Sequence, residues 1–173
     1  MLDNSLLYVT TVDEVDFYRF KTRLFHYFYK PMANYEKLFS RKIRETLDYV
    51  RGGYRTIYMV KDDEIIGYGI IAKGSGRNKF CTRNDVVIGS LYVDEAYRGN
   101  GYGNILVKGL ILCIDYQYQD VFEYIRHDNV SSIKVAHKNG FNKVNNAEYS
   151  GILRTVKINP DGHLGVYRKV KNN

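Results

Sequence analysis

The sequence predicts an α+β fold, because short β-like runs and longer helical stretches follow one another in the order β-α-α-β-β-β-α-β-α-β-β. This order contains about seven strands and about four helices. Three of the strands are consecutive, which suggests an antiparallel meander, and the later strands are separated by helices. The length of 173 residues fits one domain spanning 1–173, which buries roughly two-thirds of its unfolded surface.

The first third of the chain is expected to hold one strand and two helices. Leu6–Thr10 has a strand-like pattern, and Thr11–Glu14 has the form of a capping box, which opens a helix. Pro31 must end that helix. A second helix is expected over Asn34–Val50, where apolar residues recur at helical spacing until the pair Gly52-Gly53 closes it.

The rest of the chain is predominantly β, with two further helices. Turn-forming residues separate these elements at Asp62-Asp63, in a Gly- and Asn-rich loop after Lys73, and at Asn159–Gly162. We expect strands at Arg55–Val60, Ile65–Lys73, Val86–Val93, Val121–Arg126, Val144–Ile158 and Leu164–Val170, and helices at Gly101–Tyr116 and Asn129–Asn139.

The composition indicates a globular protein that attracts polyanions. Apolar residues make up 45% of the chain, charged residues 26%, and the formal net charge is +7. A net positive charge attracts nucleic acid, anionic lipid or a phosphorylated cofactor. The basic residues are spread along the sequence and form no cluster that would indicate which of these ligands is bound. No apolar run approaches the roughly 20 residues that span a bilayer. Because no signal segment is recognised either, we expect a cytoplasmic protein without membrane contact.

Neither a metal site nor a disulfide is expected. Cys81 and Cys113 lie far apart in the sequence and form no C-x-x-C pair, which favours two reduced thiols. The four His residues lack the spacing of metal ligands.

The most informative segment is a glycine-rich turn after an expected strand. Gly99, Gly101 and Gly103 alternate with Asn100 and Tyr102 where a helix is expected to begin. Glycines at alternate positions leave no side chains over the backbone, so successive N–H groups at the positive helix end can surround a phosphate or pyrophosphate. The spacing fails the dinucleotide pattern G-x-G-x-x-G, and no Gly-Lys-Ser/Thr follows as a P-loop requires.

This turn resembles the R/Q-x-x-G-x-G/A pyrophosphate motif of the GNAT acetyltransferases, and the preceding Leu-Tyr-Val-Asp-Glu-Ala-Tyr also looks like that family. The resemblance implies an α/β/α sandwich whose mixed central sheet is splayed in the middle. It implies that backbone groups of Leu91 and Val93, with Tyr92 between them, pair with the pantetheine arm of coenzyme A, and that a backbone N–H there polarises the thioester carbonyl. The pyrophosphate set is then Arg98, Gly99, Asn100, Gly101, Tyr102 and Gly103.

A second stretch, Asn129–Phe141, resembles the later helix of that family that contacts coenzyme A, including its K-x-G-F ending. The resemblance implies that Asn129 contacts the pantetheine and that Ser132 and Lys138 approach the cofactor. A purely structural interpretation stays open, because Asn is a preferred N-cap and Gly140 a preferred helix stop. The element order agrees with the GNAT fold, so the resemblance covers nearly the whole chain.

The usual acid and base of that family are missing. Many GNAT enzymes carry Tyr four residues before the Gly of the Gly-Phe pair, where this chain has Ala136, and several carry Glu at the position of Tyr124. An acceptor amine must nevertheless lose a proton in order to attack. The candidates for proton transfer are Tyr124, Tyr92, Ser90, His137, Asp85 and His127.

The expected function is metal-independent transfer of the acetyl group of acetyl-CoA to a primary amine, by direct attack in a ternary complex. One alternative is a non-catalytic acyl-CoA-binding regulatory or interaction protein, suggested by the missing Tyr and Glu. Another is a nucleic-acid-binding module, which rests on net charge alone and lacks a recognition motif. The sequence leaves open the acceptor, a small-molecule or protein amine, and the oligomeric state, for which a homodimer is one option.

Overall fold

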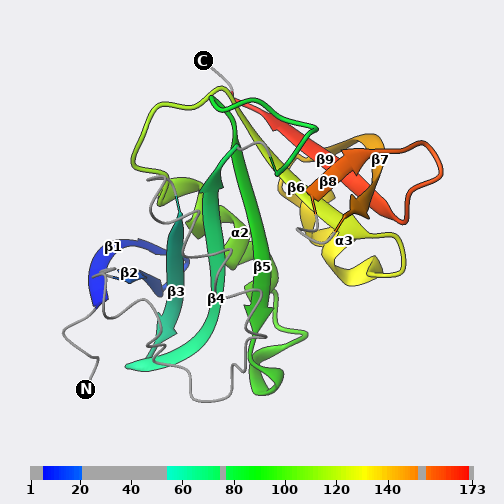
Figure 1. The fold of residues 1–173 in the computed structure, drawn as a ribbon. Coiled ribbons are helices and arrows are strands. Elements are labelled where there is room, and N and C mark those ends of the chain that lie inside the picture. The colour runs from blue at the N-terminus through cyan, green and yellow to red at the C-terminus, as the bar shows by residue number, and fades with distance from the viewer. Residues whose placement is uncertain (1–5, 21–53, 75–76, 152–154, 172–173) are drawn as a thin grey trace.

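The structure, a computed structural model, describes residues 6–20, 54–74, 77–151 and 155–171. These residues form one nine-stranded sheet with the strand order β1-β2-β3-β4-β5-β6-β9-β7-β8, together with two α-helices and one 3-10 helix (Figure 1). The strands are β1 (Leu6–Val12), β2 (Val15–Phe20), β3 (Arg55–Lys61), β4 (Glu64–Lys73), β5 (Val86–Val93), β6 (Asp120–Arg126), β7 (Asn142–Ser150), β8 (Thr155–Ile158) and β9 (Leu164–Val170). The helices are η1 (Glu95–Tyr97), α2 (Tyr102–Leu112) and α3 (Val130–Lys138).

The first five strands form an antiparallel meander, which confirms the expectation for the run from β3 to β5. Two of its connections are two-residue turns. Asp13 and Glu14 have φ of 47° and 64°, and Asp62 and Asp63 have φ of 49° and 62°. Positive φ at both central residues marks the tight hairpin turn whose twist matches that of the flanking strands.

The prediction that a helix opens at Thr11–Glu14 is wrong for the residues that follow, because Val15–Phe20 form the strand β2. Val12 pairs with Val15 across the turn, and Val15 and Phe17 are both buried, so the apolar residues follow the two-residue period of a strand. The continuation of that helix to Pro31, and the helix expected over Asn34–Val50, lie outside the described residues.

The second half of the sheet holds β6, β9, β7 and β8. The extended segment expected over Val144–Ile158 consists of two antiparallel strands, β7 and β8, and the chain turns at Gly151 with φ of 68°. Together with β2, this division gives nine strands where about seven are expected. The turn Asn159–Gly162 is confirmed and delivers β9 between β6 and β7, antiparallel to both.

Both described α-helices pack on the same side of the sheet. Leu106, Val107 and Leu110 of α2 and Ala136 of α3 are fully buried in one core with strand residues such as Phe17. The predicted helices are confirmed, although α2 begins one residue later and ends four residues earlier than expected. It ends at Leu112, with Cys113 as C-cap, and Asp115 beyond it pairs with the guanidinium groups of Arg19 and Arg55 on β2 and β3.

The sheet opens between β5 and β6, the only parallel neighbours among the described strands. Their pairing comprises Val86 with Val121 and Val87 with Phe122, and then stops. Figure 1 shows β5 and β6 meeting at one end and diverging toward the other. The splayed mixed sheet expected from the family resemblance is therefore present.

Gly109 lies where α2 packs on β2, and an added Cβ would come within 2.1 Å of the Phe17 ring. We expect Gly109→Ala to lower the free energy of unfolding by about 1–3 kcal/mol, because overpacking outweighs the roughly 1 kcal/mol gain in helix propensity. Denaturant unfolding measures the change. Gly89→Ala is the control, since its Cβ meets no atom within 4 Å, and equal losses in both variants would contradict this packing.

Candidate functional site

The candidate site begins at the edge of β5 that faces β6. Among the described strands none pairs with this edge beyond Val87, whereas the opposite edge of β5 pairs with β4 as far as Val93. On its other edge, β6 pairs with β9 along its whole length. The opening therefore has one free edge on β5 and one on β6.

A β-bulge lies in the middle of the free edge. The register of β5 against β4 shifts between Gly89 and Tyr92, and Ser90 between them has a left-handed φ of 51°. A bulge bends its strand and redirects the backbone groups beside it. Leu91 and Val93, which are expected to pair with the pantetheine arm, lie in and just beyond this bulge.

The glycine-rich turn follows β5 and η1 and leads into α2. Gly99 and Gly101 have φ of 83° and 84°, a conformation that glycine adopts without strain. Gly101 is the N-cap of α2, no described side chain caps it, and the first turn contains no acidic residue. A Cβ added at either glycine would meet no atom within 4 Å. The start of the helix therefore has no side-chain cap and open space beside its glycines, and the positive end of a helix favours an anion.

Gly103 has a different surrounding from the other two glycines. A Cβ added there would lie 3.3 Å from Cγ2 of Val135 on α3. Its missing side chain therefore allows close packing of α2 on α3, and its expected contact with a phosphate would come from the backbone alone.

Side chains after β5 tie the turn to the β3–β4 hairpin. The Tyr97 hydroxyl donates to Glu64 at 2.7 Å, and the Lys61 ammonium donates to the Tyr102 hydroxyl at 2.9 Å. The two Tyr rings meet edge to face, 5.8 Å apart. The hydrogen bond to Glu64 raises the pKa of Tyr97, and the hydrogen bond to Tyr102 raises the pKa of Lys61. These contacts fix the position of the turn.

Arg98, which is expected to contact a cofactor phosphate, is held by its own turn. Its Nε donates to the Val93 carbonyl at 3.0 Å, its Nη1 lies 3.1 Å from Glu95, and its guanidinium is 5.6 Å from the centroid of the Tyr92 ring. The side chain is 53% exposed, and an exposed ion pair of this kind contributes little to stability. The phosphate contact stays a prediction.

Asn129 is the N-cap of α3, which confirms its structural interpretation. Its Oδ1 accepts from the backbone N–H of Ser132 at 3.2 Å and from the Ser131 hydroxyl at 3.0 Å. The cap uses the side-chain oxygen, so the amide N–H₂ group can serve a second partner. Ser132 is half-buried and Lys138 is exposed. The cofactor contacts of all three residues stay predictions.

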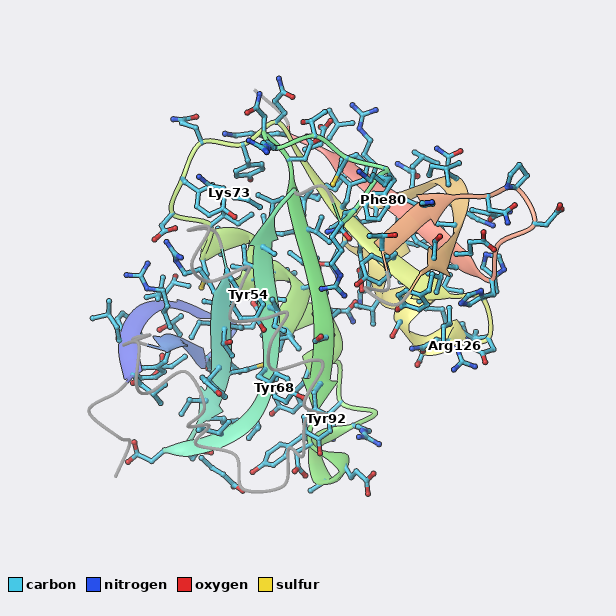
Figure 2. The ribbon with its side chains drawn as sticks, in the orientation of Figure 1. Tyr54, Tyr68, Lys73, Phe80, Tyr92 and Arg126 are labelled. Atoms are coloured by element: carbon cyan, nitrogen blue, oxygen red, sulfur yellow. The ribbon has the colours of Figure 1, made fainter. Side chains whose placement is uncertain are left out.

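Two of the side chains considered for proton transfer lie on the sheet face opposite the helices. Tyr124 on β6 belongs to an aromatic row, with ring centroids 5.9 Å from Phe80 and 6.2 Å from Tyr149. Tyr92 on β5 stacks on Tyr68 at 5.3 Å, and Figure 2 shows both of these rings beside each other. The structure thus places one tyrosine from each strand of the opening on the same face.

The other four candidates are not brought together with these tyrosines. Ser90 is exposed in the bulge, and His127 is exposed beyond β6. His137 is exposed on α3, where its ring meets Tyr167 edge to face at 5.6 Å, on the helix side of the sheet. Asp85 is buried and accepts three hydrogen bonds from its own loop and from the start of β6, which is a structural role.

Glu123 is a buried acid that sequence reasoning missed. It is 4% exposed, and its Oε2 has no hydrogen-bond partner. Burial raises the pKa of its carboxyl to about 8. A signal was present in the sequence, because strand alternation places this residue on the same face of β6 as the buried Val121 and Ile125.

Within the ranges that the structure describes, no three His, Cys, Asp or Glu side chains are grouped as metal ligands. In the same ranges, no helix has the length and apolar character needed to cross a membrane.

The buried carboxyl of Glu123 should make stability fall as the pH rises. Its pKa is raised from the ordinary 4.5 to about 8, so between these values folding requires the carboxylate of the unfolded chain to take up a proton. The penalty is absent below about pH 4.5, grows by at most about 1.4 kcal/mol per pH unit and is constant above about pH 8.

Glu123→Gln keeps the shape of the side chain and removes the ionisable group. We therefore expect the variant to gain stability relative to the wild type as the pH is raised from about 5 to about 8. Urea unfolding at several pH values measures this difference. A stability difference that is constant across the range would contradict the buried, proton-binding carboxyl.

The family model described as the acetyltransferase (GNAT) family matches residues 17–141 of the chain. A search of curated proteins by sequence finds no match. Among solved structures, the ribosomal alpha-N-protein acetyltransferase RimL in its apo form has a TM-score of 0.63 at 14% identity, over 96% of this chain and 95% of that one.

Two further structures share the fold. The ribosomal-protein-alanine N-acetyltransferase from Brucella melitensis has a TM-score of 0.55 at 18% identity, over 76% of this chain and 77% of its own. The N-acetyltransferase PseH of Campylobacter jejuni, in complex with acetyl coenzyme A, has a TM-score of 0.53 at 15% identity, over 78% and 80%. Because the family model covers well over half of the chain and the solved relatives share its splayed sheet fold, the chain belongs to the GNAT acetyltransferase family.

Proposed function

We propose that this chain is an N-acetyltransferase that moves the acetyl group of acetyl-CoA to a primary amine by direct attack in a ternary complex. One observation carries the proposal. The free edge of β5 continues, through the turn with Gly99 and Gly101, into the uncapped N-terminus of α2. A ligand that joins a pyrophosphate to an amide-bearing arm fits this arrangement. The N-terminus of α2 binds anions, and the free edge of β5 can pair with the amide groups of the arm as it would with another strand.

In this arrangement the pyrophosphate lies on the N–H groups of the glycine turn, and the pantetheine arm runs back along β5 past Val93 and Leu91. Asn129, at the start of α3, offers its amide nitrogen from the β6 side of the opening. The net charge of +7 attracts the cofactor phosphates. The acetyl-CoA complex of PseH, which shares this fold, supports the same cofactor here.

The protein then supplies proximity, an oxyanion donor and a proton path. Holding the thioester and the amine together makes the attack effectively unimolecular. A backbone N–H of the bulged stretch of β5 stabilises the tetrahedral oxyanion. Tyr124 and Tyr92 share the face opposite the helices, and they are the candidates to take the amine proton, directly or through water.

The acceptor is an amine, and its class has to be found by assay. Two of the compared proteins are ribosomal-protein N-acetyltransferases, so protein N-terminal amines come first in the panel, followed by lysine, aminoglycosides, polyamines, amino sugars and aminoacyl-tRNA. Release of the coenzyme A thiol measures turnover. Turnover with any amine excludes the non-catalytic acyl-CoA-binding alternative, whereas thermal stabilisation by acetyl-CoA without turnover supports that alternative.

The glycine turn gives a direct test of cofactor binding. Acetyl-CoA at about 100 times its Kd should stabilise the wild type by about 2.7 kcal/mol and raise its Tm. Gly101→Val should abolish this rise, because a β-branched side chain both disfavours the φ of 84° and fills the open space over the helix end.

Gly151→Val is the matched control for that variant. Gly151 also has a positive φ, of 68°, and open space around it, but it lies in the β7–β8 turn. Both variants should lose stability through backbone strain, and only Gly101→Val should lose the response to acetyl-CoA. A Gly101→Val protein that responds like the wild type would remove the main support for the site.

Arg98 gives a second test of the phosphate site. We expect Arg98→Ala to raise the KM for acetyl-CoA by about 5- to 150-fold, the range for a lost charge-assisted hydrogen bond of about 1–3 kcal/mol. Added salt should weaken binding to the wild type more than to the variant. Glu95→Gln is the control, because it breaks the exposed ion pair with Arg98 and keeps the guanidinium. An unchanged KM in Arg98→Ala would count against the assignment.

A further inference from the structure

Glu123 is a buried carboxyl for which the proposed mechanism has so far no use. Its cross-strand partner on β9 is Tyr167, and its Oε2 has no hydrogen-bond partner. Burying an acid without a partner is unfavourable, and an apolar residue at this strand position would avoid the cost. A group kept in such a state in an enzyme is a candidate for a chemical role.

The position of Glu123 along β6 is the second observation. The last pair between β5 and β6 is Val87 with Phe122, so Glu123 is the first residue of β6 inside the opening. The glycine turn lies beyond the far end of β5. A cofactor whose pyrophosphate occupies that turn and whose arm follows β5 backward therefore brings its thioester to the closed end of the opening, where Glu123 lies.

The face of β6 is the third observation. Glu123 alternates with Phe122 and Tyr124 and so lies on the helix side, where α3 packs on β6. The α3 residue most buried in that core is Ala136, at 0% exposure. Ala136 has no group that can transfer a proton. Adding the tyrosine ring found there in many GNAT enzymes would overpack a filled core.

We propose that Glu123 is the general acid that protonates the departing sulfur of coenzyme A, an inference that rests on the proposed acetyltransferase function. The neutral amine attacks the thioester carbon and gives up one proton to a base on the opposite face. The C–S bond breaks, its electron pair stays on sulfur, and the Glu123 O–H gives its proton to that sulfur. Coenzyme A leaves as the thiol, and the carboxylate regains a proton from solvent.

The surroundings keep this carboxyl protonated at neutral pH. Burial raises the pKa of Glu123 to about 8, close to the value at which an acid works best near pH 7. Tyr167 on β9 is the cross-strand ionisable partner of Glu123, and burial together with the charge of the carboxylate raises the pKa of Tyr167. Lys169 lies two residues farther along β9, and His137 on α3 contacts the Tyr167 ring. The neighbouring β5 residues on that face, Val86 and Ile88, are apolar. The Lys169 ammonium is held by the Asn139 carbonyl at 2.8 Å.

Solvent can return the proton through the same face. Tyr167 is the cross-strand partner of Glu123, and its ring meets the ring of His137, which is exposed on α3. One buried and one exposed side chain with polar hydrogens thus lie on the same face as the carboxyl.

The test compares Glu123→Gln with the wild type at saturating acetyl-CoA and amine. We expect kcat to fall by about 10²–10⁴, typical for loss of a general acid, and the decline of wild-type kcat above about pH 8 to disappear. Glu148→Gln on β7, a half-buried acid outside the opening, is the matched control and should keep the wild-type kcat. Stabilisation of Glu123→Gln by coenzyme A shows that the variant is folded and binds.

A spectroscopic readout on the wild type does not depend on the variant's folding or on turnover. In protein labelled with ¹³C at the Glu side-chain carboxyls, one resonance should titrate near pH 8 and shift when coenzyme A is added. Glu123→Gln should lack that resonance. A carboxyl that titrates near pH 4.5, or one that does not respond to coenzyme A, would overturn the proposal.

The kinetic outcomes separate this proposal from the proposed function. If the wild type turns over and Glu123→Gln keeps its kcat and pH profile, the general acid is wrong and the acetyltransferase stands. The same conclusion follows if Tyr124→Phe or His137→Gln, instead of Glu123→Gln, removes the decline at high pH. If the wild type releases no coenzyme A with any amine in the panel, both proposals fall together.

Discussion

The junction of β5 and β6 is the constraint on which the rest of the structure depends. Two ladder positions join the two halves of the sheet, and beyond them the strands separate, because the bulge at Ser90 bends β5 while β6 stays paired with β9 along its whole length. A parallel pair needs a crossover, and α2 supplies it on the helix side. Backbone groups left unpaired must find water or a ligand. The opening therefore favours an extended molecule that can pair with a strand edge, which is the property required of the proposed cofactor.

The same junction gives the glycine turn its direction. The chain leaves the free end of β5, makes one turn of 3-10 helix, and enters α2 at Gly101, so the positive end of α2 lies beyond the end of the strand edge. The bonds from Tyr97 to Glu64 and from Lys61 to Tyr102 hold this geometry from the β3–β4 hairpin. A site that is fixed before its ligand arrives loses less conformational entropy on binding. These two hydrogen bonds thus contribute to affinity without contacting the ligand.

Sequence reasoning succeeded where the signals are local and failed where packing decides. Gly99 and Gly101, the cap at Asn129 and the turn at Asp62-Asp63 depend on backbone preferences of single residues, so the sequence alone located them. The Thr-x-x-Glu pattern at Thr11–Glu14 fits a helix start as well as a hairpin turn, and the choice of β2 comes from its pairing with β3. Glu123 escaped notice because its burial depends on α3 and β9, which lie far away in the sequence.

Strand alternation on β6 offers one physical reason for a departure from the usual residues of the family. Glu123 and Tyr124 are neighbours in the chain, yet they lie on opposite faces of the sheet at the closed end of the opening. On the proposed mechanism, the amine approaches from the face with Tyr124 and the thiolate departs on the face with Glu123. The two proton transfers then have separate groups in separate environments, one among half-buried aromatic rings and one in the apolar core. Placing the acid on β6 also frees α3 from carrying one, so Ala136 can close the core and hold α3 against the strand that bears the carboxyl.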